Sequence, residues 1–66
     1  MNGNMLRGLI IAAGYTLQEF AQAMGINNTS LSHKINSKRD FTLKEVQKIS
    51  RILRLTDDQI YTIFFA

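Results

Sequence analysis

The chain has 66 residues, of which 45% are apolar and 20% are charged. This length allows one small domain, because independent domains need about 50 residues and rarely divide below ~100. The balance of apolar and charged residues is typical of a chain that folds and not of a disordered segment. We therefore expect residues 1–66 to form one domain, which excludes a two-domain enzyme.

The absence of cysteine excludes disulfide frameworks and thiolate metal sites, and it favours an intracellular protein. The longest apolar run, residues 9–13, has five residues, whereas a membrane span needs about 20. The run is also too short for a secretory signal that leaves a useful mature chain. We expect no transmembrane helix and no membrane partner.

The charge balance favours a polyanionic partner. Eight Lys and Arg residues against five acidic residues give a formal net charge of +3, and the pI is about 9.7. This charge is modest in absolute terms but large for so small a surface, and it is compatible with nucleic-acid binding.

End signals predict the first two of five helices. The first spans about residues 5–13, with Asn4 as its N-cap and Gly14 free to adopt a positive φ at its end. In the second, Thr16 and Glu19 form a capping box, and Gly25 ends the helix. The residues expected to face the core are Leu6, Leu9, Ile10 and Ala13 in the first helix and Leu17, Phe20, Ala21 and Met24 in the second.

The remaining helices follow the same rules. The third begins after Asn27, buries Leu31 and Ile35, and ends at residues 36–37. A capping box of Thr42 and Glu45 begins the fourth, whose apolar stripe consists of Leu43, Val46, Ile49 and Leu53. The fifth is predicted to begin after Thr56, where two acidic residues favour a helix start, and to run to about residue 64.

Residues 16–36, TLQEFAQAMGINNTSLSHKIN, have the layout of a helix-turn-helix, with two short helices and a glycine-containing turn of three or four residues. Ala21 allows the two helices to approach closely. Gly25 supplies a left-handed turn, and Ile26 fills the angle between the helices.

From about residue 6 to residue 55 the chain resembles the Cro and lambda-repressor-like group of phage regulators, most clearly in TLQEFAQAMGI and KEVQKISRIL. The closing IYTIFF resembles the end of small phage-encoded members. The resemblance implies an all-α, five-helix DNA-binding domain that lays its third helix in the major groove. It also implies a transcriptional regulator, of repressor type, that binds an inverted-repeat DNA operator in the bacterial cytoplasm or nucleoid.

The third helix carries an uncharged polar stripe that suits base recognition. Asparagine can bond an adenine edge, threonine can contact a thymine methyl group, and histidine can bond purine N7. The alternative is the solvated side of an amphipathic helix, with Asn27 and Ser30 as capping residues. The predicted base-reading residues are Asn28, Thr29, Ser32, His33 and Asn36.

Phosphate contacts are expected from groups beside the third helix, since such contacts set the register on DNA. The predicted set is Gln18, Lys34, Lys38, Arg39 and Lys44. Lys48, Arg51 and Arg54 lie on the side of the fourth helix opposite its apolar stripe, and a hydrated outer face explains them better.

Two positions depart from the family pattern. Family members often place glutamine directly after the position of Thr16, whereas this chain has Leu17 there and Gln18 next. Members also often join the first and third helices by an ion pair, whereas this chain has Ile10 and Ile35 at those places. An apolar pair can replace a buried ion pair without loss of stability.

The terminal segment, residues 60–65, is too apolar for an isolated surface helix. Ile60, Ile63 and Phe64 can cover the core, which leaves Tyr61 and Phe65 on an adjacent strip. Exposed aromatic residues mark interfaces, so we expect a two-fold homodimer that addresses half-sites about one helical turn, ~34 Å, apart. The alternative is that both aromatics pack on the first helix of their own chain.

The residue types of this chain argue against an enzyme. It has one histidine and no cysteine, and no nucleophile–base pair or metal-ligand spacing can be assembled. We expect no catalytic residues, metal, cofactor or small-molecule substrate. The stronger alternative to DNA binding is an antirepressor that docks a partner repressor protein.

Overall fold

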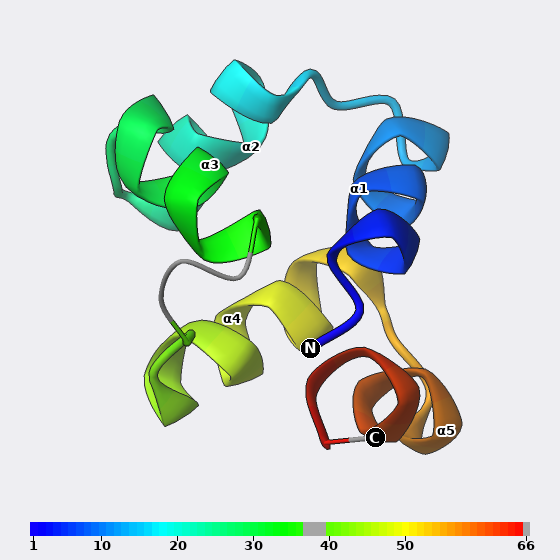
Figure 1. Ribbon diagram of the computed structural model, residues 1–66. Coiled ribbons are helices and arrows are strands. Elements are labelled where there is room, and N and C mark those ends of the chain that lie inside the picture. The colour runs from blue at the N-terminus through cyan, green and yellow to red at the C-terminus, as the bar shows by residue number, and fades with distance from the viewer. Residues whose placement is uncertain (37–39, 66) are drawn as a thin grey trace.

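The computed structural model describes residues 1–36 and 40–65, and these ranges are helical with no β-strand (Figure 1). The elements are α1 (Gly3–Ala12), α2 (Leu17–Met24), α3 (Asn28–Ile35), α4 (Leu43–Leu53), α5 (Asp57–Ile60) and η1 (Tyr61–Phe65), the last a π-helical turn. The N-terminal end of the chain lies beside η1, because the N–H of Asn2 donates to the carbonyl of Ile63 (Figure 1). The predicted all-α class is confirmed.

Three of the helices begin with a capping box. In each, a threonine hydroxyl accepts from the backbone N–H three residues later, and the side chain at that position accepts from the threonine N–H. The pairs are Thr16 with Glu19, Thr42 with Glu45, and Thr56 with Gln59. The predicted starts of α2, α4 and α5 are therefore confirmed.

The start of α1 differs from the prediction, because Asn2 and not Asn4 is its cap. Asn2 Oδ1 accepts from the backbone N–H of Met5 at 3.1 Å. The backbone N–H of Asn2 donates to the carbonyl of Ile63 in η1 at 2.7 Å. This second bond joins Asn2 to a residue far along the chain. Local capping preferences therefore could not identify Asn2 as the cap.

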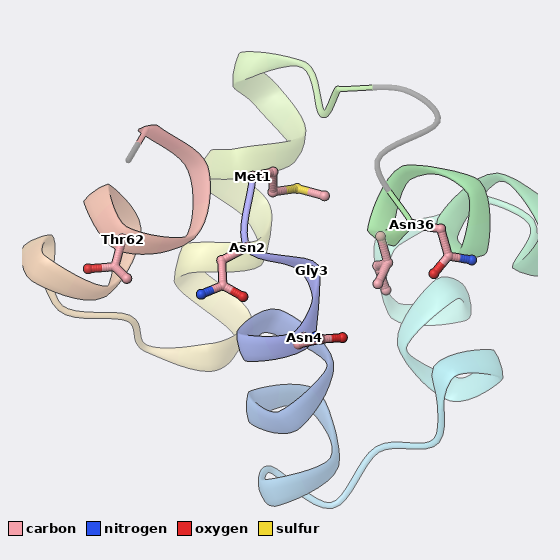
Figure 2. Close-up of a pocket in the computed structure, with 7 residues that line it drawn as sticks. Met1, Asn2, Gly3, Asn4, Asn36 and Thr62 are labelled. Atoms are coloured by element: carbon pink, nitrogen blue, oxygen red, sulfur yellow. The ribbon is translucent and has the colours of Figure 1, made fainter.

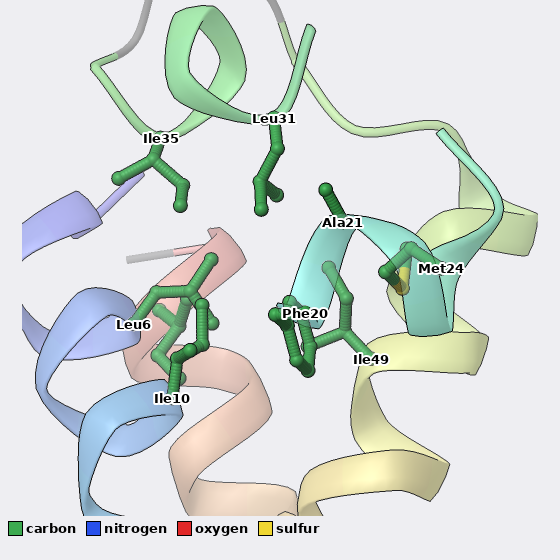
Figure 3. Close-up of a cluster of buried hydrophobic side chains, with 9 residues drawn as sticks. Leu6, Ile10, Phe20, Ala21, Met24, Leu31, Ile35 and Ile49 are labelled. Atoms are coloured by element: carbon green, nitrogen blue, oxygen red, sulfur yellow. The ribbon is translucent and has the colours of Figure 1, made fainter. Parts of the chain in front are cut away.

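One apolar cluster joins α1, α2, α3, α4 and η1 (Figure 3). Its buried members are Leu6, Ile10, Phe20, Ala21, Met24, Leu31, Ile35, Ile49 and Ile63. Ile10 and Ile35 are both buried, as expected of an apolar pair in place of an ion pair. Two predicted core residues are exposed instead: Leu43 is at the first position of α4, and Ala13 lies just past the end of α1.

The turn between α2 and α3 has the predicted geometry. Gly25 has a φ of 75°, and the N–H of Ile26 donates to the carbonyl of Ala21 at 3.0 Å. Asn27 begins α3, since its Oδ1 accepts from the N–H of Ser30 at 2.7 Å. This short connection sets α2 and α3 against each other at an angle (Figure 1).

Lys48 has a structural role that the sequence did not indicate. Its Nζ donates to the carbonyl of Met24, the last residue of α2, at 3.2 Å. A cation near a helix C-terminus also interacts favourably with the helix dipole. Lys48 is exposed, as expected of a residue on a hydrated face, and it also ties the end of α2 to α4.

The C-terminal helix departs from its predicted form. It is α-helical only to Ile60 and continues as a π-helical turn through Phe65. Ile63 is fully buried, whereas Tyr61 and Phe65 are each 62% exposed. The alternative in which both aromatics pack on α1 of their own chain is therefore wrong. Within the described ranges, no helix combines the length and apolar character that crossing a bilayer requires.

Candidate nucleic-acid interface

The outer side of α3 is polar and open to solvent. Thr29, His33 and Asn36 are exposed there, and Ser32 is half-buried beside them. Asn28 is exposed as the first residue of the helix. The inner side of the same helix holds Leu31 and Ile35 in the core. The structure thus brings the five predicted base-reading residues onto one helix, at the outer surface of the α2–α3 pair.

A shallow hollow of about 160 Å³ adjoins this polar side near the start of α3. Thr29 and His33, which are one helical turn apart, line the hollow together with Ser30 and Lys34. The side chains around the hollow offer hydrogen-bond donors and acceptors without a carboxylate among them. A flat base edge or a phosphate oxygen matches such a lining.

Lys34 is engaged with its own chain. Its Nζ lies 2.7 Å from both carboxylate oxygens of Glu45 in α4, and 5.7 Å from the ring centroid of Phe41. Burial raises the pKa of Glu45, but the hydrogen bond from Lys34, the backbone N–H of Thr42 and the charge of Lys34 together lower it below its ordinary value. The predicted phosphate role of Lys34 would require this ion pair to open.

Asn36, at the other end of the polar side, is held by a residue of α1. Arg7 donates from Nη2 to Asn36 Oδ1 at 2.9 Å and from Nη1 to Asn4 Oδ1 at 3.3 Å. The sequence reading assigned no role to Arg7. Because Arg7 and Asn36 are 29 residues apart, no motif or helical spacing could have paired them.

Of the other predicted phosphate contacts, Gln18 and Lys44 are exposed in the first turns of α2 and α4. Lys44 directly precedes Glu45, whose carboxylate bonds Lys34 of α3. The start of α4 therefore lies beside α3. Lys38 and Arg39 fall outside the described residues.

The two exposed aromatics lie on η1, an element separate from α3. Phe65 and its neighbour Phe64 line a groove of about 280 Å³ together with Phe41 and Val46 of the α4 region. Phe41 and Phe64 meet edge to face, with ring centroids 6.0 Å apart. Tyr61 lies one π-turn before Phe65. Both predicted interface residues are thus accessible, and Phe65 lines a largely apolar groove that also includes Asp40.

The family described as "Protein of unknown function (DUF739)" matches residues 3–66. The chain belongs to the DUF739 family. No curated protein and no solved structure matches it. The DUF739 match begins at the first residue of α1 and includes every helix, so the polar side of α3 and the η1 turn are both within the family region.

The described part of this DUF739 chain holds no group of three or more His, Asp or Glu residues placed to bind a metal ion. His33 is exposed on α3, and its neighbours around the hollow are hydroxyl, amide and ammonium groups. The acidic residues Asp57 and Asp58 lie in the first turn of α5, where they favour the helix start.

Proposed function

We propose that this DUF739 protein is a sequence-specific, double-stranded DNA-binding transcriptional regulator of the Cro and repressor type. In this proposal α2 and α3 form a helix-turn-helix, and α3 enters the major groove. The observation that carries it is the division of α3 into two sides, with Leu31 and Ile35 anchored in the core and an uncharged polar side open to solvent.

The dimensions of α3 suit this role. An α-helix with its side chains is about 10–12 Å across, which fits the roughly 12 Å width of the major groove. Asn28, Thr29 and His33 are exposed over the first two turns, where helix-turn-helix proteins contact base edges. Ser32 and Asn36 extend the same side toward the end of α3.

Phosphate contacts complete the proposed interface. Gln18 and Lys44 would grip the backbone from the starts of α2 and α4, with Lys38 and Arg39 as further proposed contacts. Lys34 and Glu45 would hold α3 and α4 in a fixed relation and so place Lys44. The net charge of +3 supports association with DNA from long range.

The proposal includes a two-fold homodimer formed through Tyr61 and Phe65. Two α3 helices related by a two-fold axis would address half-sites ~34 Å apart, which requires an inverted-repeat operator. The exposure of both aromatic rings, and the groove that Phe65 lines together with Phe41 and Phe64, support this interface. Such a regulator acts on DNA in the bacterial cytoplasm.

Selection of bound sites from a pool of random duplexes tests the proposal directly. We expect a short inverted repeat to be enriched by the wild-type protein. A variant in which Asn28, Thr29 and His33 are replaced by alanine should retain its helical circular dichroism, because all three are exposed, but should enrich no sequence. Wild-type protein that enriches no sequence would refute sequence-specific binding.

A second candidate function is an antirepressor that docks another repressor protein. The exposed Tyr61 and Phe65 and the groove beside them favour it, because aromatic residues are enriched in protein interfaces. Binding to a protein through these rings should change little with salt, whereas DNA binding weakens steeply as salt increases. Titrations at two salt concentrations therefore separate the two functions.

A further inference from the structure

The geometry points to Arg7 as a DNA-phosphate contact at the C-terminal end of α3, held in place by Asn4 and Asn36. This inference rests on the proposed function and adds to it a residue of α1. Arg7 lies outside the α2–α3 pair and outside the set of cations that follow α3 in the sequence.

The bonds of Arg7 orient its charge without neutralising it. Its guanidinium donates to the amide oxygens of Asn4 and Asn36, and both acceptors are uncharged. Among residues 1–36 and 40–65, no carboxylate oxygen lies within 4.0 Å of the guanidinium. A guanidinium has five N–H donors, so at least three remain after these two bonds. The arrangement differs from that of Lys34, whose ammonium meets a carboxylate.

The two side chains that accept from Arg7, Asn4 and Asn36, both line an open polar cleft. A space of about 570 Å³ lies between the start of α1, the end of α3 and Thr62 of η1 (Figure 2). Asn4 extends from α1 toward the end of α3, where Asn36 forms the opposite side (Figure 2). The side chains that line this cleft include three asparagines and no acidic residue, so an approaching phosphate meets no like charge.

Arg7 lies at one flank of α3, and this position indicates that it would contact the DNA backbone. Lys34 and Asn36 are two residues apart, about 200° around a helix, so they lie on opposite flanks of α3. α4 holds the first flank through Glu45, and α1 holds the second through Arg7. If α3 occupies the groove, the Asn36 flank meets one DNA backbone, and Arg7 is a cation at that flank.

The bond from Arg7 also fixes the orientation of the Asn36 side-chain amide. Its Oδ1 accepts from the guanidinium, which directs the donor group Nδ2 away from Arg7. Arg7 and Asn36 then present adjacent donors, a pattern that suits a phosphate with its acceptor oxygens. Asn36 therefore acts together with Arg7 on the backbone, and the base-reading residues of the proposed interface are those nearer the start of α3.

The test measures binding of the full chain to a selected operator duplex and to a random duplex over a range of salt concentrations. Arg7→Gln should weaken binding to both duplexes about tenfold, the effect of one charge-assisted hydrogen bond. It should also lower the slope of log K against log salt by about 1, because one phosphate contact is lost. Arg51→Gln, which removes an exposed cation from α4, is the matched control and should leave the slope unchanged.

Asn4→Asp separates a phosphate contact from a merely structural role. The new carboxylate would pair with Arg7 and lie in the first turn of α1, so the thermal midpoint should stay equal or rise. Binding to both duplexes should fall more than in Gln47→Glu, which adds the same charge at an exposed position of α4.

The results distinguish this inference from the proposed function. If Arg7→Gln keeps the wild-type slope, or if Arg51→Gln lowers it equally, Arg7 is not a phosphate contact, although operator selection can still succeed. If the wild type prefers no sequence, the proposed function fails. In that case the slope on random duplex still supports or overturns the contact made by Arg7.

Discussion

Lys34 of α3 and Glu45 of α4 form an ion pair in which the ammonium lies 2.7 Å from both carboxylate oxygens. Glu45 also completes the capping box of α4 with Thr42. One carboxylate therefore fixes the start of α4 and joins it to α3. Both side chains are largely covered, with 14% and 17% of their surface exposed, so this pair is screened less than a typical surface pair.

The ion pair predicts a pH dependence of stability. The pKa of Glu45 is lowered in the folded chain, so its charge stabilises the fold above the unfolded-state pKa of about 4.3. This contribution is lost as the pH falls through the lowered value. Glu45→Gln keeps a side chain that can complete the capping box but removes the charge. We expect it to reduce the free energy of unfolding by roughly 1 kcal/mol at pH 7.

Urea denaturation at several pH values measures this difference. The stability of the wild type and of Glu45→Gln should converge at low pH, where the wild-type carboxyl group is protonated as well. A constant difference between pH 7 and pH 3 would show that the charge of Glu45 does not stabilise the fold. Glu19→Gln provides the control, since it alters the equivalent capping box of α2, in which the structure shows no ion pair.

Replacement by alanine should have opposite effects on stability at Gly3 and at Gly8 of α1. A Cβ at Gly3 would overlap the carbonyl oxygen of Ile35, so Gly3→Ala must push α1 away from the end of α3. We expect a loss of about 1–3 kcal/mol, as for other overpacking. Gly8 has open space around its Cα, and Gly8→Ala should gain about 0.5–1 kcal/mol.

Thermal unfolding of the two glycine variants checks this pair of predictions. In a chain of this size, 1 kcal/mol corresponds to a shift of about 4–8 °C in the midpoint. A midpoint for Gly3→Ala equal to or above that of Gly8→Ala would contradict the close approach of α1 to Ile35.

Base-reading side chains predict selective losses of affinity. His33→Ala and Asn28→Ala should each cost about 1–3 kcal/mol on the selected operator and much less on random duplex. Both residues are exposed, so the midpoint of thermal unfolding should change little. Fluorescence anisotropy titrations measure the affinities, with Gln47→Ala on the outer side of α4 as the control. Equal losses on both duplexes would exclude a base-reading role.

The aromatic pair of η1 predicts the oligomeric state. Tyr61→Ala combined with Phe65→Ala should shift sedimentation toward the monomer and reduce operator affinity. The fold should persist, because both rings are 62% exposed. Ile11→Ala provides a matched control, since Ile11 is a 60% exposed apolar residue on α1. A double variant that remains dimeric would rule out this interface.

Local chemistry in the sequence determined most of the helix limits. Threonine caps with their partners three residues later, and glycine at the end of α2, act within a single turn, so their effect can be read from a few neighbouring letters. The inward position of Leu31 and Ile35 also follows from helical spacing alone. The same spacing puts Thr29, Ser32, His33 and Asn36 on the other side of the helix.

Tertiary structure decided the features in which residues far apart in the sequence meet. The N–H of Asn2 bonds to Ile63, Arg7 bonds to Asn36, and Lys48 bonds to Met24. The sequence could not pair them, because each bond depends on how whole helices pack and not on the intrinsic preference of either residue. For the same reason Leu43, apolar and well placed on a helical stripe, remains exposed: helical periodicity states which side a residue is on, but only packing states whether anything covers it.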